Sequence, residues 1–295
     1  MWKEYLFPAS VEEAVAMLAQ WDGRARLIAG GTDLVLEFNE GKREADCLVD
    51  ITRIPELKEI TQQGDTITVG AAVTFRQLDD SLLIRQRATV LAEAAHTVGS
   101  RQIRNVATLG GNVVSALPAA DGSLGLRALG AEAEVADIQG RRWLPLEELF
   151  ESPGQSKIDA SAQVLTALRF KALSSREGSA YERLARRRAL ALPILACGTA
   201  VGLSDDGRTF QWARVSLGPV APVCFCAHCT EEFLIGAEVS PETMARAGEI
   251  ALSESNPRSS LLRACKEYRQ EMIKVLVRRG LERAVAKCQA PLSAE

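Results

Sequence analysis

The chain has 295 residues, of which 47% are hydrophobic and 25% charged, and its formal net charge is −3. This length suffices for one large domain or two to three small domains with a buried core. The near-balanced charge excludes the basic footprint of a nucleic-acid-binding protein. No apolar run approaches the roughly 20 residues of a membrane span.

Seven cysteines without regular spacing indicate reduced thiols and not a disulfide framework. Glu4 and Pro8 interrupt the apolar run that a secretory signal needs, so a cytoplasmic location is expected.

The first part of the chain is predicted to be a small α/β unit. Ser10 and Glu13 form a capping box, and apolar residues follow at helical spacing, which predicts a helix over 11–20. Short apolar runs at 26–29 and 47–51 predict two strands, and the second precedes a turn near Pro55. We therefore expect a first subdomain over residues 1–55.

A middle subdomain is expected over residues 56–173. Gly64 and Asp65 separate Ile60 from the run 66–70, which predicts a β-hairpin. Helices are predicted over 74–79 and 90–98, and strands over 133–138 and 164–170. Between them, 99–122 is rich in Gly, Asn and Ser and is long for a mere connection, so we expect a functional loop there.

The polar linker 174–179 introduces a third region, expected to extend over residues 174–295. Apolar runs at 196–203 and 211–217 flank an Asp-Gly turn and predict a meander, after which two helices close the chain. The last helix is the clearest, because Ile273, Leu276 and Leu281 belong to one apolar stripe. The predicted fold class is α+β.

Two segments combine paired glycines with polar side chains. Leu27 to Leu34 reads as a strand that runs into Gly30 and Gly31 and then into a hydroxyl and a carboxylate. Because glycine lacks Cβ, such a pair lets backbone N–H groups converge and lets a ligand approach, which suits a diphosphate. A plain glycine turn is an equally good interpretation of this segment alone. It is not the G-x-G-x-x-G fingerprint of dinucleotide-binding folds.

The second segment runs from Gly99 to Asp121. A glycine pair at 110–111 is flanked by Thr108 and Asn112, and Asp121 can accept hydrogen bonds from sugar or polyol hydroxyls. One nest for a diphosphate and a second segment along a groove are what a dinucleotide with a polyol arm requires.

Together these segments resemble a known family. Ala29-Gly-Gly-Thr-Asp-Leu34, Gln102-Ile-Arg-Asn-Val-Ala-Thr-Leu-Gly-Gly-Asn112 and Pro118-Ala-Ala-Asp121 look like the paired FAD motifs of the medium subunit of xanthine dehydrogenase-type molybdenum hydroxylases. The resemblance continues through 181–197, 217–222, 257–260 and 266–269, so it covers essentially the whole chain. It implies two α/β subdomains that clasp an extended FAD and a C-terminal subdomain, with a small antiparallel sheet and helices, that closes over the flavin.

The resemblance also implies a set of FAD contacts. Residues 27–34 would hold the diphosphate, Leu165 would lie at the adenine side, and Leu192 would lie against the isoalloxazine ring, although an ordinary core leucine is an equal alternative for Leu192. Many xanthine dehydrogenases have an acidic residue just before the position of Leu192, where this chain has Ala191, so the flavin surroundings here would be less negative. The full expected set is Leu27, Ile28, Ala29, Gly30, Gly31, Thr32, Asp33, Leu34, Gly99, Thr108, Gly111, Asn112, Asp121, Leu165, Arg183 and Leu192.

No catalytic or metal-binding residue is expected in this chain. Cys224, Cys226, His228 and Cys229 resemble half of a zinc or iron–sulfur site, but no second ligand cluster accompanies them. Two distant histidines without a nucleophile motif give no basis for hydrolysis.

The expected function is therefore electron transfer through FAD. In the family, electrons pass from a molybdenum cofactor through [2Fe-2S] clusters in partner subunits to FAD and then to NAD or another acceptor. The alternative is a free-standing flavin-dependent oxidoreductase of the same superfamily, which would need its own substrate domain. The substrate would be bound in another chain. A purine is the first guess, because 257–269 resembles bacterial xanthine dehydrogenase medium subunits, and nicotinate-type heterocycles are near alternatives.

Overall fold

The computed structural model describes residues 2–187, 189–260 and 263–289. The chain forms two compact units, each assembled from separate stretches. The first comprises Met1–Gln77, Arg101–Ala116 and Ala131–Lys171, and the second comprises Leu78–Ser100, Leu117–Gly130 and Ala172–Glu295. Both mix helices and strands, as the predicted α+β class requires. Within the described residues, no helix has the length and apolar character to cross a membrane.

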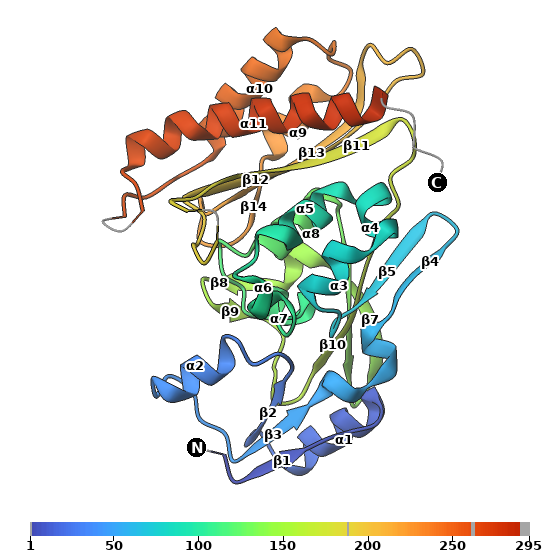
Figure 1. Cartoon of the computed structure of the whole chain (residues 1–295), viewed down its shortest axis with the longest axis vertical. Coiled ribbons are helices and arrows are strands. Elements are labelled where there is room, and N and C mark those ends of the chain that lie inside the picture. Colours follow the sequence, from blue (N-terminus) through green and yellow to red (C-terminus); the bar gives the residue numbers. More distant parts are fainter. Residues whose placement is uncertain (1, 188, 261–262, 290–295) are drawn as a thin grey trace. The chain divides into compact units, whose positions relative to one another are not determined.

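A three-stranded parallel sheet opens the first unit (Figure 1, blue). Its order is β1 (Glu4–Leu6), β3 (Cys47–Asp50) and β2 (Ala25–Ile28). Helix α1 (Val11–Gln20) begins as predicted, with the Ser10 hydroxyl accepting a hydrogen bond from the Glu13 amide. Its buried side chains Val11, Ala14, Val15 and Leu18 share a core with β2 and β3. The short helix α2 (Leu34–Asn39) follows β2.

A five-stranded antiparallel sheet forms the rest of the first unit. Its order is β4 (Ile60–Gln63), β5 (Thr66–Gly70), β10 (Val164–Lys171), β6 (Glu132–Asp137) and β7 (Gly140–Pro145), and the β4–β5 hairpin is confirmed. Ile67, Val69 and Leu168 are buried, whereas Thr68, Glu134 and Trp143, on the opposite face, are partly exposed. Smaller elements are η1 (Ile51–Arg53), η2 (Pro55–Lys58), α6 (Arg101–Arg104), α7 (Leu109–Val114), η3 (Leu146–Leu149), β8 (Phe150–Ser152) and β9 (Gln155–Ser156).

The second unit is built on a four-stranded antiparallel sheet. The order is β11 (Glu177–Leu184), β12 (Leu195–Leu203), β13 (Phe210–Gly218) and β14 (Phe225–Cys226). Helix α11 (Lys266–Gln289) packs on β11 and β12, α10 (Pro241–Glu254) packs on α11, and α9 (His228–Leu234) packs on α10 and β13. From the other face, α5 (Thr89–Thr97) packs on β11 and β12, and α8 (Asp121–Ala128) packs on β12 and β13 (Figure 1). Helix α4 (Leu82–Arg87) adjoins α5, and α3 (Phe75–Asp80) contains the change from the first unit to the second.

Several expectations about local structure were wrong. The stretch 99–122, expected as a loop, contains α6, α7 and the start of α8, because each is too short for helical periodicity to show. Strand β11 was missed, and it begins inside the predicted linker, at Glu177. Among the described residues, three helices follow β14, not two. The division into subdomains at 55 and 173 stays a prediction.

Candidate functional site

The loop between β2 and α2 has the features of an anion-binding turn. Gly31 has φ +67°, a conformation that side chains rarely adopt. The four amides of residues 30–33 donate no hydrogen bond to any part of the chain that the structure describes. Asp33 precedes α2 without making a side-chain cap. Four consecutive N–H groups without an acceptor are the donors that a diphosphate needs, so this loop fits the predicted ligand.

Gly30 brings the two glycine segments together. A Cβ atom at Gly30 would lie 1.9 Å from the carbonyl oxygen of Val106, so only glycine allows the loop to pack against the segment that precedes α7. The loop at 29–33 and the motif at 102–112 are therefore neighbours within the first unit. The sequence predicted this association only through the family resemblance.

The second glycine pair is built differently from the first. Thr108 caps α7 by accepting a hydrogen bond from the amide of Gly111 at 3.1 Å, and the amide of Gly110 donates to the carbonyl of Ala71. A Cβ at Gly110 would lie 2.7 Å from both the carbonyl oxygen and the Cβ of Ala71, whereas one at Gly111 would meet only the Thr108 hydroxyl, at 3.0 Å. Gly110 thus serves packing. Gly111 is exposed, so its side of the helix remains accessible to a ligand.

Asp121 lies at the centre of a buried polar cluster in the second unit. Its Oδ1 accepts hydrogen bonds from the Tyr181 hydroxyl at 2.7 Å and from Arg183 Nε at 2.9 Å. Tyr181 and Arg183 are two residues apart on β11 and so share one face of the strand. Burial raises the pKa of Asp121, although Arg183 and the Tyr181 hydroxyl act in the opposite direction. Sequence reasoning missed Tyr181 as a partner of Asp121, and its i, i+2 spacing to Arg183 was the available signal.

Arg183 also holds the loop that carries Leu192. One of its terminal nitrogens donates to the carbonyl of Ala191. The neighbouring Leu190 has φ +51°, its amide donates to the Gly99 carbonyl at 3.1 Å, and its own carbonyl accepts from Arg187. Hydrogen bonds thus connect Asp121 to Arg183, and they connect both Arg183 and Gly99 to the residues just before Leu192. Leu192 itself is 56% exposed, so it is not an ordinary core leucine.

Further predicted residues lie in or next to the strands of the first unit. Leu27 and Ile28 belong to β2, Leu34 is the first residue of α2, and Leu165 is buried in β10 beside a register shift. Partial desolvation, with a smaller contribution from Glu37, raises the pKa of Asp33.

The cysteine-rich stretch 224–229 includes β14 and the start of α9. Cys226 and Cys229 have Cys-x-x-Cys spacing, but among the described residues no three His, Cys, Asp or Glu side chains gather around a common point. Burial raises the pKa of Cys224 to about 12, and Glu254 raises the pKa of the exposed Cys229. Both shifts disfavour the thiolate form in the chain without a metal.

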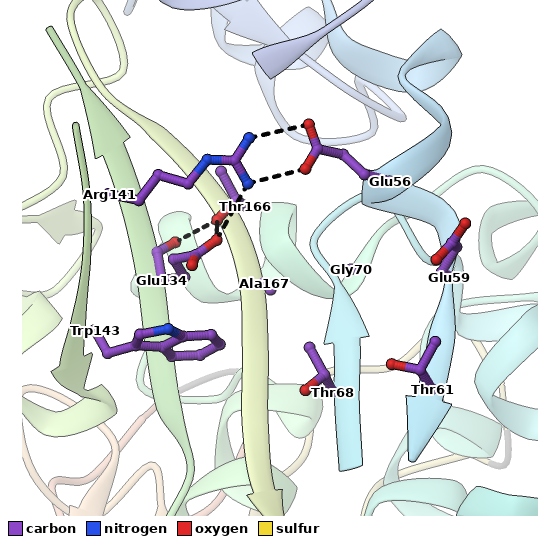
Figure 2. Close-up of a pocket in the computed structure, with 10 residues that line it drawn as sticks. All are labelled: Glu56, Glu59, Thr61, Thr68, Gly70, Glu134, Arg141, Trp143, Thr166 and Ala167. Atoms are coloured by element: carbon purple, nitrogen blue, oxygen red, sulfur yellow. Dashed lines mark hydrogen bonds and ion pairs between the residues drawn. The ribbon is translucent and has the colours of Figure 1, made fainter. Parts of the chain in front are cut away.

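A cavity of about 210 Å³ lies elsewhere in the first unit, on the exposed face of the five-stranded sheet (Figure 2). Glu134, Arg141, Trp143 and Glu59 are among the residues that line it, and none of the predicted FAD contacts is. Sequence analysis gave no indication of this cavity.

Comparison with known proteins identifies the family. Residues 2–170 match the model of the FAD binding domain in molybdopterin dehydrogenase, and residues 179–284 match that of the CO dehydrogenase flavoprotein C-terminal domain. The chain is 34% identical over 244 residues to the nicotinate dehydrogenase FAD-subunit of Eubacterium barkeri, covering 82% of each protein. It is 29% identical to the xanthine dehydrogenase FAD-binding subunit of Escherichia coli O157:H7, covering 94% of each.

Solved structures agree over the whole fold. The carbon monoxide dehydrogenase of Hydrogenophaga pseudoflava contains a chain that superposes with a TM-score of 0.91 at 30% identity, covering 98% of this chain and 99% of that one. Quinoline 2-oxidoreductase of Pseudomonas putida 86 gives a TM-score of 0.88 at 25% identity, covering 98% and 99%. These relatives are named for different substrates, so the likeness does not select one. The chain belongs to the FAD-binding, medium-subunit family of the xanthine dehydrogenase-type molybdenum hydroxylases.

Proposed function

We propose that this chain is the electron-transfer subunit of a heteromeric molybdenum hydroxylase, in which electrons pass from iron–sulfur clusters through FAD to NAD or another acceptor. The observation that carries the proposal is the loop at 30–33, whose four amides lack acceptors within the described chain. A diphosphate would supply acceptor oxygens to these donors. The family match over residues 2–170 adds independent support.

Different residues would bind different parts of the FAD molecule. Residues 27–34 would hold the diphosphate, with Thr108, Gly111 and Asn112 beside them and Leu165 at the adenine side. Gly99, Asp121, Arg183 and Leu192 would serve the flavin end, where Arg183 fixes the backbone of the loop that carries Leu192. Here Asp121 acts by holding Arg183 in place.

The FAD supplies the redox chemistry, and the protein supplies binding, orientation and electrostatics. The loop at 30–33 fixes the cofactor through backbone N–H groups, which cannot ionise and so bind equally over a wide pH range. The Asp121–Arg183 pair is itself buried, with both side chains 8% exposed. No side chain in this proposal acts as an acid, a base or a nucleophile.

Partner chains would contribute the other centres. Relatives of this chain are named as medium chains or as one subunit of a dehydrogenase complex. We therefore expect one partner with [2Fe-2S] clusters and one with a molybdenum cofactor. By this proposal the isolated chain transfers electrons only between reduced nicotinamide or artificial donors and artificial acceptors, and it hydroxylates no heterocycle.

Isolation of the protein from its native cell tests this function. A tagged chain should co-purify with two further polypeptides, identified by mass spectrometry, together with iron and molybdenum. A preparation that consists of this chain alone and turns over its own substrate would contradict the proposal and favour a free-standing flavoenzyme.

A further inference from the structure

The cavity on the sheet face is created by the register of four strands. Gly70, Ala167, Glu134 and Trp143 are consecutive partners across β5, β10, β6 and β7. Ala167 has only a methyl side chain, and a hollow remains beside it, between Trp143 on one side and the segment that contains Glu59 on the other (Figure 2). Its volume of about 210 Å³ is below the roughly 300–1,000 Å³ of pockets for drug-sized ligands, so it suits a small group.

The net charge of the residues that line the cavity indicates the charge of the group that it binds. Glu56, Glu59 and Glu134 contribute three carboxylates and Arg141 one guanidinium, which leaves a net charge of −2. Arg141 is already engaged by both oxygens of Glu56, at 2.9 and 3.1 Å, and by Glu12 at 2.7 Å. Its Nη1 also lies 3.6 Å from Glu134 Oε2, so Arg141 partly neutralises Glu134, whereas Glu59 has no ion pair within the part of the chain that the structure describes.

Several oxygens on the wall are open to solvent and have no partner among the described residues. The side chains of Glu59, Thr61 and Thr68 make no hydrogen bond to the described part of the chain. Glu134 receives a hydrogen bond from the Thr166 hydroxyl at 2.5 Å, which fixes the orientation of its carboxylate. Such a wall can accept hydrogen bonds from an ammonium or guanidinium group.

Trp143 adds an aromatic face. Arg169 stacks on its ring with the guanidinium carbon 4.1 Å from the ring centroid, and Glu132 holds Arg169 at 2.7 Å. Figure 2 shows the ring lying next to the hollow below Glu134 and Arg141. Indole is the strongest of the aromatic rings in attracting cations.

We propose that this cavity binds a guanidinium or ammonium group on a short alkyl chain. The group inserts between the Trp143 ring and the carboxylates of Glu59 and Glu134, and the threonine hydroxyls accept its remaining N–H groups. The group belongs either to a free organic cation or to a basic side chain of a partner subunit. This site is separate from the proposed FAD contacts.

Calorimetric titration of the full chain with n-butylguanidinium chloride tests the proposal, with n-butylurea as the neutral control of the same shape. The cation should bind at a ratio of one to one and at least about tenfold more tightly than the urea. Trp143→Leu should weaken it about five- to tenfold, and Trp143→Phe should weaken it less. Glu59→Gln should weaken binding about threefold. Glu44→Gln, which removes an exposed carboxylate outside the cavity, should leave it unchanged.

The outcomes separate the two sources and the two proposals. Loss of the titration in the intact native complex, with binding by the isolated chain, identifies a partner's basic side chain, whereas binding in both identifies a free cation. Equal affinity for the cation and the urea, or wild-type affinity in Trp143→Leu, would overturn the inference. The FAD content of Trp143→Leu should equal that of the wild type. The calorimetric titration therefore tests the cation site, and the FAD content tests the proposed function separately.

Discussion

Arg183 and Asp121 form a buried ion pair between two elements of the second unit, with Nε and Oδ1 2.9 Å apart and both side chains 8% exposed. Asp121 is the first residue of α8, where the helix dipole favours a negative charge. The same carboxylate oxygen accepts the Tyr181 hydroxyl. Two donors of the protein, the Tyr181 hydroxyl and Arg183 Nε, therefore already bond the oxygen of Asp121 that was expected to accept a hydrogen bond from a cofactor hydroxyl.

Asp121→Ala should destabilise the fold as well as weaken FAD binding. It leaves a buried arginine without its counter-ion, and breaking such a pair costs about 3–5 kcal/mol. Tyr181→Phe, the matched control, removes one hydrogen bond and keeps the ion pair, so it should cost about 1 kcal/mol. Urea unfolding of both variants measures the difference. Equal and small losses would show that the ion pair contributes little.

Gly31→Val should abolish FAD binding. The residue has φ +67°, and a Cβ there would lie 3.2 Å from Val35, so valine would distort the loop and turn its amides away from a diphosphate. Gly41→Val is the control, because Gly41 has the same φ and an open environment. Both should lose about 1–2 kcal/mol of stability through backbone strain. Only Gly31→Val should lose flavin, as measured by absorbance after gel filtration, and loss in both would refute a specific role for the loop.

The thiols should react in the order of their exposure and ionisation. Cys265 and Cys229 are exposed, but the neighbouring Glu254 raises the pKa of Cys229. A thiol-specific chromogenic reagent at pH 8 should therefore modify Cys265 first and Cys229 more slowly, and it should leave Cys224 unmodified until the protein unfolds. Replacing Cys224, Cys226 and Cys229 with serine should remove no metal. Stoichiometric iron or zinc in the wild-type chain, lost in this variant, would contradict the interpretation.

Stability should fall in alkali because of Tyr181. Burial, followed by the charge of Asp121, raises the pKa of Tyr181 well above its ordinary value of 10.0. Above about pH 10 the unfolded chain releases this proton and the folded chain keeps it, so the free energy of unfolding decreases as pH rises, by up to about 1.4 kcal/mol per pH unit. Tyr181→Phe should show a shallower decrease between pH 10 and 11 in urea unfolding. Identical slopes would mean that Tyr181 ionises equally in both states.

Local patterns predicted those elements whose cause is local. The Ser10 cap, the Gly64-Asp65 hairpin and the stripe on α11 each depend on residues close together in sequence. The association of Gly30 with Val106 and of Asp121 with Arg183 depends on pairs 76 and 62 residues apart. Only the family resemblance indicated that the segments containing these residues act together. The cavity beside Trp143 arises from strand register, which no single strand reveals.

The flavin content of the purified chain tests the central claim most directly. The account predicts a yellow protein with about one FAD per chain, released on acid precipitation because neither glycine segment contains a histidine or cysteine that could form a covalent flavin bond. A colourless chain that takes up no added FAD would contradict it.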